Sequence, residues 1–332
     1  MPLVLQPDAL AFANNSKIQP RQKPYNFRLE PLVQACFKLH PAFSLQGIDI
    51  LCGLDNLRKI FDFASGKQSK EFRIDMELCS NTLMMTRWEP LQENMSQTSL
   101  CRGYGRGFEA SCATQEGRMT KASSHHRVIS YSLGDLNLVV QFEADATDCQ
   151  CSQRLGCENS DTSLFHQRSL SATSAAPQHA FPEDPSSPLD VVDIGTMHGF
   201  DCMIEIKSRD HKNTASDDIM IQMWLSGCRK LYLGRHVRGY FDTDAVYQGN
   251  IDAELVIWQR QHTDEILSFL GILEQIREKV YESAFGEFGG RFALVCKPVG
   301  TEMVLKLWRR EGGQDMLRHE TMDKLWRFQV KR

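Results

Sequence analysis

The sequence lacks the features that would place it in a membrane or coat it with nucleic acid. Its 332 residues contain no apolar run of about 18 residues, so no transmembrane helix and no membrane partner are expected. The formal net charge is only −4 at pH 7, which leaves room for a local basic groove but for no general attraction to nucleic acid. The start, MPLVLQPDAL, has no positively charged region. We therefore expect an intracellular protein, nuclear or cytoplasmic.

Several common catalytic signatures are also missing. There is no Walker A loop, G-x-S-x-G elbow or H-E-x-x-H motif, which argues against the common NTPase, esterase and zincin activities. We expect no nucleotide cofactor. The 11 cysteines are an odd number scattered along the chain, and they are interpreted as reduced thiols. The segment DCQCSQRLGC, followed by His166, offers zinc ligands, but its C-x-C spacing fits a zinc site poorly, and unpaired thiols are the favoured interpretation.

The chain divides into a short arm and one folded domain. Residues 1–25 are polar and contain prolines, and we expect a loose N-terminal arm there. Residues 26–332 are expected to form a single domain. Within it, residues 146–190 are rich in Ser, Thr, Pro and Gln and poor in large apolar side chains, which is typical of a flexible insertion.

Strand-like and helix-like segments alternate through that domain. Strands are expected in FRIDMEL, TLMMTRW, CMIEIKSR and the pair HRVISYSLGDLNLVVQFEADA, which turns at Gly134-Asp135. Helices are expected in DNLRKIFDFA, at 217–227 and at 263–283, the last with Thr263 as its N-cap. This order predicts an α/β (α+β) fold with a mixed central β-sheet flanked by helices. The tryptophans at 224, 258 and 308 are expected in the core.

Two pairs of charged residues occur in apolar strands. Glu143 and Asp145 are two residues apart in VVQFEADA, and Glu205 and Lys207 have the same spacing in CMIEIKSR. Residues at this spacing leave the same face of a strand. Carboxylates on a half-buried strand are costly unless a cation compensates them, and Mg²⁺ and Mn²⁺ prefer oxygen ligands. Each pair alone is also typical of a solvated edge or an ion pair. Together they predict a divalent-metal nuclease centre at the middle of the sheet.

The order of short motifs adds a resemblance. From about Phe27 to Arg310 the chain resembles the DXO-type decapping nucleases, a branch of the PD-(D/E)XK nuclease superfamily. GRGFE resembles the family's Gly-Φ-x-x-Glu motif, FEADA its Glu-Φ-Asp motif and IEIKSR its Glu-Φ-Lys motif. IQMWLSGCRKLYLGRHVRGYF resembles the segment that follows. The resemblance implies a PD-(D/E)XK nuclease-like domain that hydrolyses RNA 5′-end structures, which many members follow by degrading the RNA from its 5′ end.

The resemblance also implies the metal ligands. Asp145 and Glu205 would bind Mg²⁺ or Mn²⁺. Glu109 and Glu143 would bind it directly or through water, and the Ile206 carbonyl would complete the shell.

Other residues are candidates for the substrate side. In the family's pattern Lys207 contacts the attacking water and Gln222 positions the substrate. Arg106, next to Glu109, is a candidate for a phosphate-binding groove, although a plain surface position is also open. Arg127, at the entry of its strand, is a candidate for contact with phosphate or bases, with a solvated strand entry as the alternative.

One departure from the family leaves the function open. Cys52-Gly53 stands where the family has an arginine, and Arg58 is offset from that position. The expected function is a metal-dependent hydrolase acting on RNA 5′ ends. A non-catalytic relative that binds RNA or a protein partner, and a DNA nuclease of the same superfamily, are the alternatives. Which 5′ end is recognised does not follow from the sequence.

Overall fold

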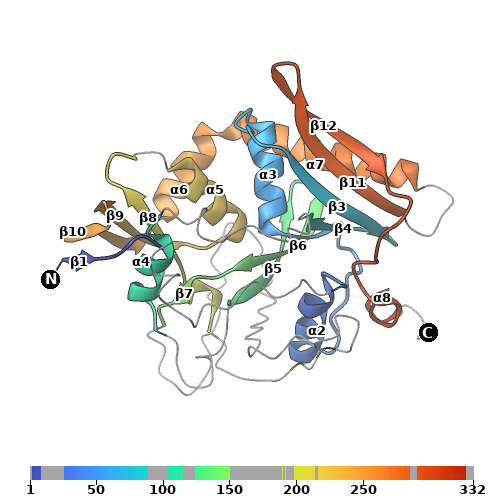
Figure 1. Ribbon diagram of the computed structural model, residues 1–332. Helices are drawn as coiled ribbons and strands as arrows, with labels where there is room; N and C mark the ends of the chain where they lie inside the picture. Colours follow the sequence, from blue (N-terminus) through green and yellow to red (C-terminus); the bar gives the residue numbers. More distant parts are fainter. Residues whose placement is uncertain are drawn as a thin grey trace.

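The computed structural model describes residues 2–8, 26–88, 103–114, 124–149, 189, 191, 198–213, 216–284 and 290–326. Within these ranges the chain forms two mixed β-sheets flanked by helices (Figure 1). This confirms the predicted α/β (α+β) class. It also corrects the expectation of one central sheet, because the strands divide between two sheets.

The larger sheet, in the described ranges, has seven strands in the order β12-β11-β3-β4-β2-β6-β5. The strands are β2 (Ile50–Gly53), β3 (Phe72–Cys79), β4 (Thr82–Arg87), β5 (His126–Leu133), β6 (Leu136–Glu143), β11 (Gly290–Val299) and β12 (Glu302–Arg309). β2 runs parallel to β4 and β6, and the other pairs are antiparallel. The predicted pairs β3–β4 and β5–β6 are confirmed, and Gly134 makes the β5–β6 turn with a φ of 60°.

The smaller sheet has the order β1-β10-β9-β8-β7 among the described residues. The strands are β1 (Leu3–Val4), β7 (Ala146–Thr147), β8 (Met203–Asp210), β9 (Lys230–Val237) and β10 (Tyr240–Asn250). β8 and β9 are parallel, whereas β7 pairs with β8 and β1 pairs with β10 in the antiparallel sense. The 3₁₀ turn Phe200–Cys202 leads directly into β8.

The described helices are α2 (Glu30–Leu39), α3 (Leu54–Ala64), α4 (Gly105–Cys112), α5 (Asp217–Ser226), α6 (Asp252–Gln261), α7 (Thr263–Ser283) and α8 (His319–Trp326). Apart from α4, which packs against β8 of the smaller sheet, they cover the two faces of the larger sheet. The main core joins one face of this sheet to α3, α5, α6 and α7, and a second core joins the other face to α2 and α8 (Figure 1). Alternation along β2 shows the division, because Ile50 and Cys52 face the first core and Leu51 faces the second.

The N-terminal arm expected at 1–25 is wrong for its first residues. Leu3 and Val4 pair with Phe241 and Tyr240 of β10, and Asp8 is buried. Residues 9–25 lie outside the described residues. Residues 146–147 of the insertion expected at 146–190 form β7. Residues 150–188, with the remaining candidate zinc ligands, lie outside the described residues.

Two smaller expectations also need correction. Thr263 does not cap the following helix, because its hydroxyl donates to the Gln259 and Arg260 carbonyls at the end of α6. Trp224 and Trp258 pack together in the main core at a centroid distance of 6.0 Å, as predicted, whereas Trp308 on β12 is 53 % exposed. None of the described helices is long and apolar enough to span a membrane.

Candidate metal centre

The candidate centre lies where the chain passes from one sheet to the other. β6 ends at Glu143, the Ala144 N–H donates to the His125 carbonyl at 2.8 Å, and Ala146 then pairs with Ile204 on β8. The sequence suggested that Glu143 and Asp145 share one continuous strand. The structure corrects this, because the strand ends between them. The break leaves the Glu143 side chain exposed and turns Asp145 inward, where its side chain is 12 % exposed.

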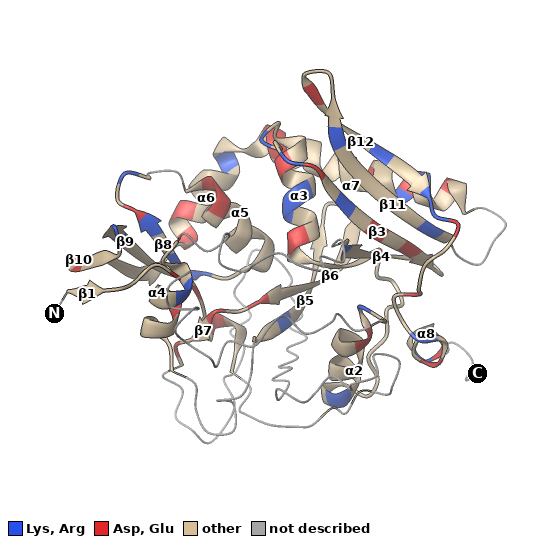
Figure 2. Ribbon diagram, in the orientation of Figure 1, with Lys and Arg blue, Asp and Glu red and all other residues tan. Residues whose placement is uncertain are grey.

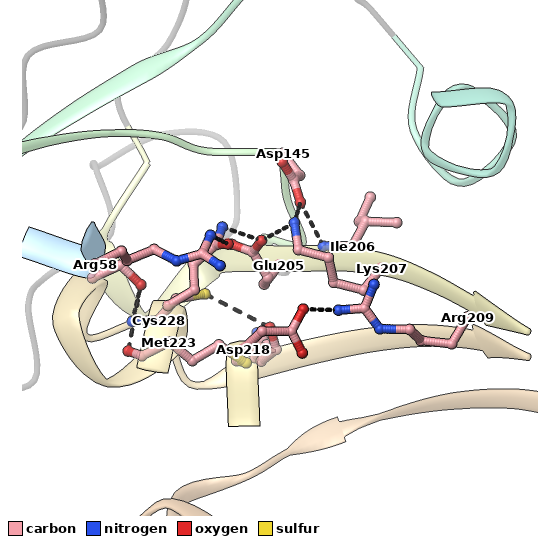
Figure 3. A network of polar contacts seen from close by, with 12 residues as sticks. Arg58, Asp145, Glu205, Ile206, Lys207, Arg209, Asp218, Met223 and Cys228 are labelled. Atoms are coloured by element: carbon pink, nitrogen blue, oxygen red, sulfur yellow. Dashed lines mark hydrogen bonds and ion pairs between the residues drawn. The ribbon is translucent and has the colours of Figure 1, made fainter. Parts of the chain in front are cut away.

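Asp145 meets the charged residues of β8. Its Oδ2 accepts the Ile206 amide N–H at 2.7 Å and lies 3.5 Å from Lys207 Nζ. Lys207 also makes a close ion pair with Glu205, whose side chain is only 2 % exposed. Figure 3 shows these side chains pointing toward one another above the strand. The structure thus brings together Asp145, Glu205 and Lys207, and their catalytic and metal-binding roles stay predictions.

Two further residues extend this network from the helices. Gln222 on α5 donates its side-chain N–H to Glu205. Arg58 on α3 donates from Nη1 to Gln222 Oε1 at 2.8 Å (Figure 3). The amide of Gln222 is therefore oriented from both sides. In the sequence, Arg58 is offset from the position of the family's arginine. The packing of α3 against α5 brings it to Gln222, which contacts Glu205.

Glu109 approaches the same centre from α4, which packs against β8. Burial and, to a lesser extent, the Asp145 and Glu143 carboxylates raise the pKa of Glu109 to about 7, while Lys207 and Arg106 oppose them. Asp145 therefore links the predicted acidic residues electrostatically, since its charge acts on both Glu109 and Glu205. Figure 2 shows acidic and basic segments side by side where β7, β8 and α4 meet.

The donor set fits a divalent cation in charge and in ligand type. Burial raises the pKa of Glu205, although Lys207 opposes the effect. Burial alone would lower the pKa of Lys207, but Glu205 and Asp145 outweigh it and the pKa is raised. Burial is thus the main reason why Glu205 resists ionisation, whereas the two carboxylates keep Lys207 protonated. In the described part of the chain no three His, Cys, Asp or Glu side chains are yet gathered closely enough to hold an ion. The Lys207 ammonium lies between the two central carboxylates instead.

The two arginine candidates have different positions. Arg106 is exposed on the first turn of α4, beside Glu109, as a phosphate contact would require. Arg127 on β5 is 1 % exposed and pairs with Phe142 of β6. The alternative of a solvated strand entry is thereby ruled out, because Arg127 is buried on the same face of β5 as Ile129, and its contact with substrate stays a prediction.

Solved structures of Rai1 proteins share the fold of this chain. Rai1 of *Scheffersomyces stipitis*, solved with (3′-NADP)⁺ and calcium, has a TM-score of 0.61 at 14 % identity, with 96 % of this chain and 84 % of that chain covered. Rai1 of *Candida albicans*, solved with pU5-Mn²⁺, has a TM-score of 0.60 at 13 % identity, covering 98 % and 88 %. Rai1 of *S. pombe*, solved with 3′-FADP, has a TM-score of 0.56 at 13 % identity, covering 93 % and 86 %. The chain therefore has the fold of these proteins, as the resemblance to DXO-type nucleases predicted.

The family follows from the sequence match. Residues 5–307 match the family model described as a domain of unknown function (DUF8563), and the chain belongs to that family. No curated protein matches the sequence.

Proposed function

We propose that this protein is a metal-dependent hydrolase that acts on the 5′ ends of RNA. The observation that carries the proposal is the convergence of Asp145 and Glu205 on Lys207, at the edge where β7 pairs with β8. The fold supports it, since *C. albicans* Rai1, which shares that fold, was solved with pU5 and Mn²⁺. Asp145 and Glu205, with Glu109 and Glu143 beside them, would hold Mg²⁺ or Mn²⁺.

When bound, the cation would polarise a phosphate and lower the pKa of a nucleophilic water. The residues of the chain have their own tasks. The Ile206 N–H fixes the Asp145 carboxylate, which is therefore preorganised rather than free to rotate. Lys207, with two carboxylates beside it, stays an ammonium and can hold a water or a phosphate oxygen by hydrogen bonds.

The substrate side of the centre would be formed by α3, α4 and α5. Gln222 offers an amide next to Glu205, and Arg58 adds a guanidinium behind it. Arg106 is exposed on α4. Guanidinium groups suit phosphate because they present several donors in one plane. Gln222 and Arg106 would therefore contact the 5′ phosphates of an RNA strand, and Arg58 would position the Gln222 amide.

The direct test compares variants on RNAs with a 5′ triphosphate, a methylated or unmethylated cap, or a nucleotide-cofactor cap, with Mn²⁺ and with EDTA. Asp145→Asn and Glu205→Gln preserve shape, and we expect each to reduce the rate at least about 100-fold. Asp148→Asn is the matched control, because Asp148 lies near the site but contacts the Tyr232 hydroxyl at 3.3 Å. Full activity in both site variants would reject the proposal. Parallel digestion of DNA tests the DNA-nuclease alternative.

One observation favours a second candidate, a non-catalytic relative that binds RNA. Cys52, which stands at the family's arginine position, is fully buried in β2, where it cannot contact a substrate. Binding of labelled RNA without turnover in Mn²⁺ would support this alternative, and measurable turnover would exclude it.

A further inference from the structure

The first residues of the chain cap a helix of the candidate centre. Asp8 is 6 % exposed. Its Oδ1 accepts the Gly107 N–H at 3.0 Å and its Oδ2 accepts the Arg106 N–H at 3.2 Å, although Asp8 and Arg106 are 98 residues apart. The Asp8 N–H in turn donates to the Gly103 carbonyl at 2.8 Å. The helix has no cap of its own, since Tyr104 at its N-cap position makes no side-chain bond.

This contact satisfies the part of a helix that most needs a partner. The first N–H groups of an α-helix have no acceptor within the helix, and they carry partial positive charge. A carboxylate is therefore among the favourable caps, and its negative charge suits this end of the helix. Asp8 meets this need for α4 from outside the helix, so the start of α4 is tied to the N-terminal segment rather than to its own loop.

Apolar packing ties the same segment to the floor of the centre. Residues 2–8, here named the N-terminal strap, pair with β10 through β1, and the Leu5 N–H donates to the Gly239 carbonyl at 2.9 Å. Leu3 and Leu5 pack in the small core formed by Phe108, Ile204, Ile206 and Phe241. Ile204 and Ile206 alternate along β8 with Glu205 and Lys207. The strap and α4 thus share the underside of the strand whose other face carries the charged network.

Glu109 lies two residues beyond Gly107 and faces the Asp145 and Glu143 carboxylates, which repel it. A short helix of eight residues has little stability of its own to resist that repulsion. Contacts from outside the helix must therefore hold α4 in place. The strap supplies two of them, the cap from Asp8 and the apolar packing of Leu3 and Leu5.

We propose that Asp8 is a positioning residue for Glu109, and that the N-terminal strap is part of the centre rather than an appendage. The proposal rests on the proposed function in one respect, that Glu109 helps to hold the cation. It predicts that the strap controls metal affinity, whereas the chemical step depends on Asp145, Glu205 and Lys207.

The test uses Asp8→Asn, which keeps the shape of the side chain but replaces one acceptor by an N–H donor. The matched control is Asp49→Asn, since Asp49 also accepts a distant backbone amide, the Asn137 N–H at 2.8 Å, far along the chain from α4. Two measurements are made on the full chain. Hydrogen exchange follows the α4 amides against those of β4, and titration with Mn²⁺ gives the dissociation constant, followed by the rate of RNA hydrolysis at saturating Mn²⁺.

In Asp8→Asn we expect α4 amides to exchange about tenfold faster, and the Mn²⁺ dissociation constant to rise about tenfold, while β4 exchange is unchanged. The rate at saturating Mn²⁺ should fall less than about threefold. Asp49→Asn, which also weakens the ion pair of Asp49 with Arg277, should leave α4 exchange and the Mn²⁺ dissociation constant unchanged. Unchanged α4 exchange would overturn the capping role, and faster α4 exchange with unchanged Mn²⁺ affinity would overturn the link to Glu109. If the unaltered protein does not bind Mn²⁺, the proposed function is rejected, and so is the link between Asp8 and metal binding through Glu109. The exchange data would still show whether Asp8 caps α4.

Discussion

Replacement of Lys207 by methionine tests the charge balance of the centre. Lys207 is 25 % exposed and lies between carboxylates that are 12 % and 2 % exposed. Methionine keeps most of the side-chain volume but removes the ammonium. The variant is therefore left with two neighbouring carboxylates whose remaining donors are the Ile206 amide and the Gln222 side chain.

The size of the effect follows from this burial. Removing one partner of a fully buried ion pair costs about 3–5 kcal/mol. Because Lys207 is a quarter exposed and Glu205 can take up a proton, we expect about 2 kcal/mol in the metal-free protein. That loss corresponds to a decrease in Tm of about 5 °C. Mn²⁺ at 100 times its dissociation constant adds about 2.7 kcal/mol, so the ion should restore the Tm of the variant.

The assay is thermal unfolding in EDTA and in Mn²⁺, with RNA hydrolysis measured in parallel. Lys230→Met is the control, since the Lys230 ammonium on the adjacent β9 donates to the Asp148 carbonyl at 3.3 Å. We expect Lys207→Met to lose at least about 100-fold in rate even when Mn²⁺ has restored its Tm. The reasoning is refuted if the metal-free Tm stays within about 1 °C of the unaltered protein, or if Mn²⁺ does not raise the Tm of the variant.

Three further predictions follow from the contacts around the centre. The pKa of Glu109 is about 7 in the folded protein and 4.5 in the reference state, so the protein loses stability as the pH rises between these values. In EDTA, Glu109→Gln should therefore raise the Tm at pH 8 by a few degrees and leave it unchanged at pH 4. Thermal unfolding followed by circular dichroism measures both values. A Cβ on Gly234 would lie 2.4 Å from the Phe108 ring, so Gly234→Ala should cost about 1–3 kcal/mol in urea unfolding and weaken Mn²⁺ binding, and an unchanged midpoint would contradict this. Arg58→Ala should raise KM for RNA in the unaltered background but have little added effect in Gln222→Ala, because Arg58 acts through that amide; additive losses in the double-mutant cycle would argue against it.

Local patterns were sufficient to predict most individual elements. The alternation in FRIDMEL and TLMMTRW predicted β3 and β4, and the glycine turn at Gly134 predicted the β5–β6 hairpin, because hydrophobic period and turn chemistry are local properties. The division into two sheets was not predictable in this way. It depends on the chain leaving β6 at Ala144, and nothing in VVQFEADA marks that departure.

The candidate centre was predicted only where its residues are close together in the sequence. The two-residue spacing of Glu205 and Lys207 correctly placed both on one face of β8. Arg58 and Asp8 were missed as neighbours of the centre, because each reaches it from an element far away in the sequence. The burial of Arg127 was not predicted, because a strand entry is usually solvated, whereas this one is covered.

The most direct test of the central claim is a crystal structure of the protein soaked in Mn²⁺, with anomalous scattering recorded at the manganese edge. The proposed function predicts an anomalous peak bonded to both Asp145 and Glu205, with Lys207 moved from its place between them, and no peak in a crystal of Asp145→Asn. A fully occupied manganese peak elsewhere, with the Lys207 ion pairs to Asp145 and Glu205 intact, would contradict the claim that these carboxylates form the metal centre.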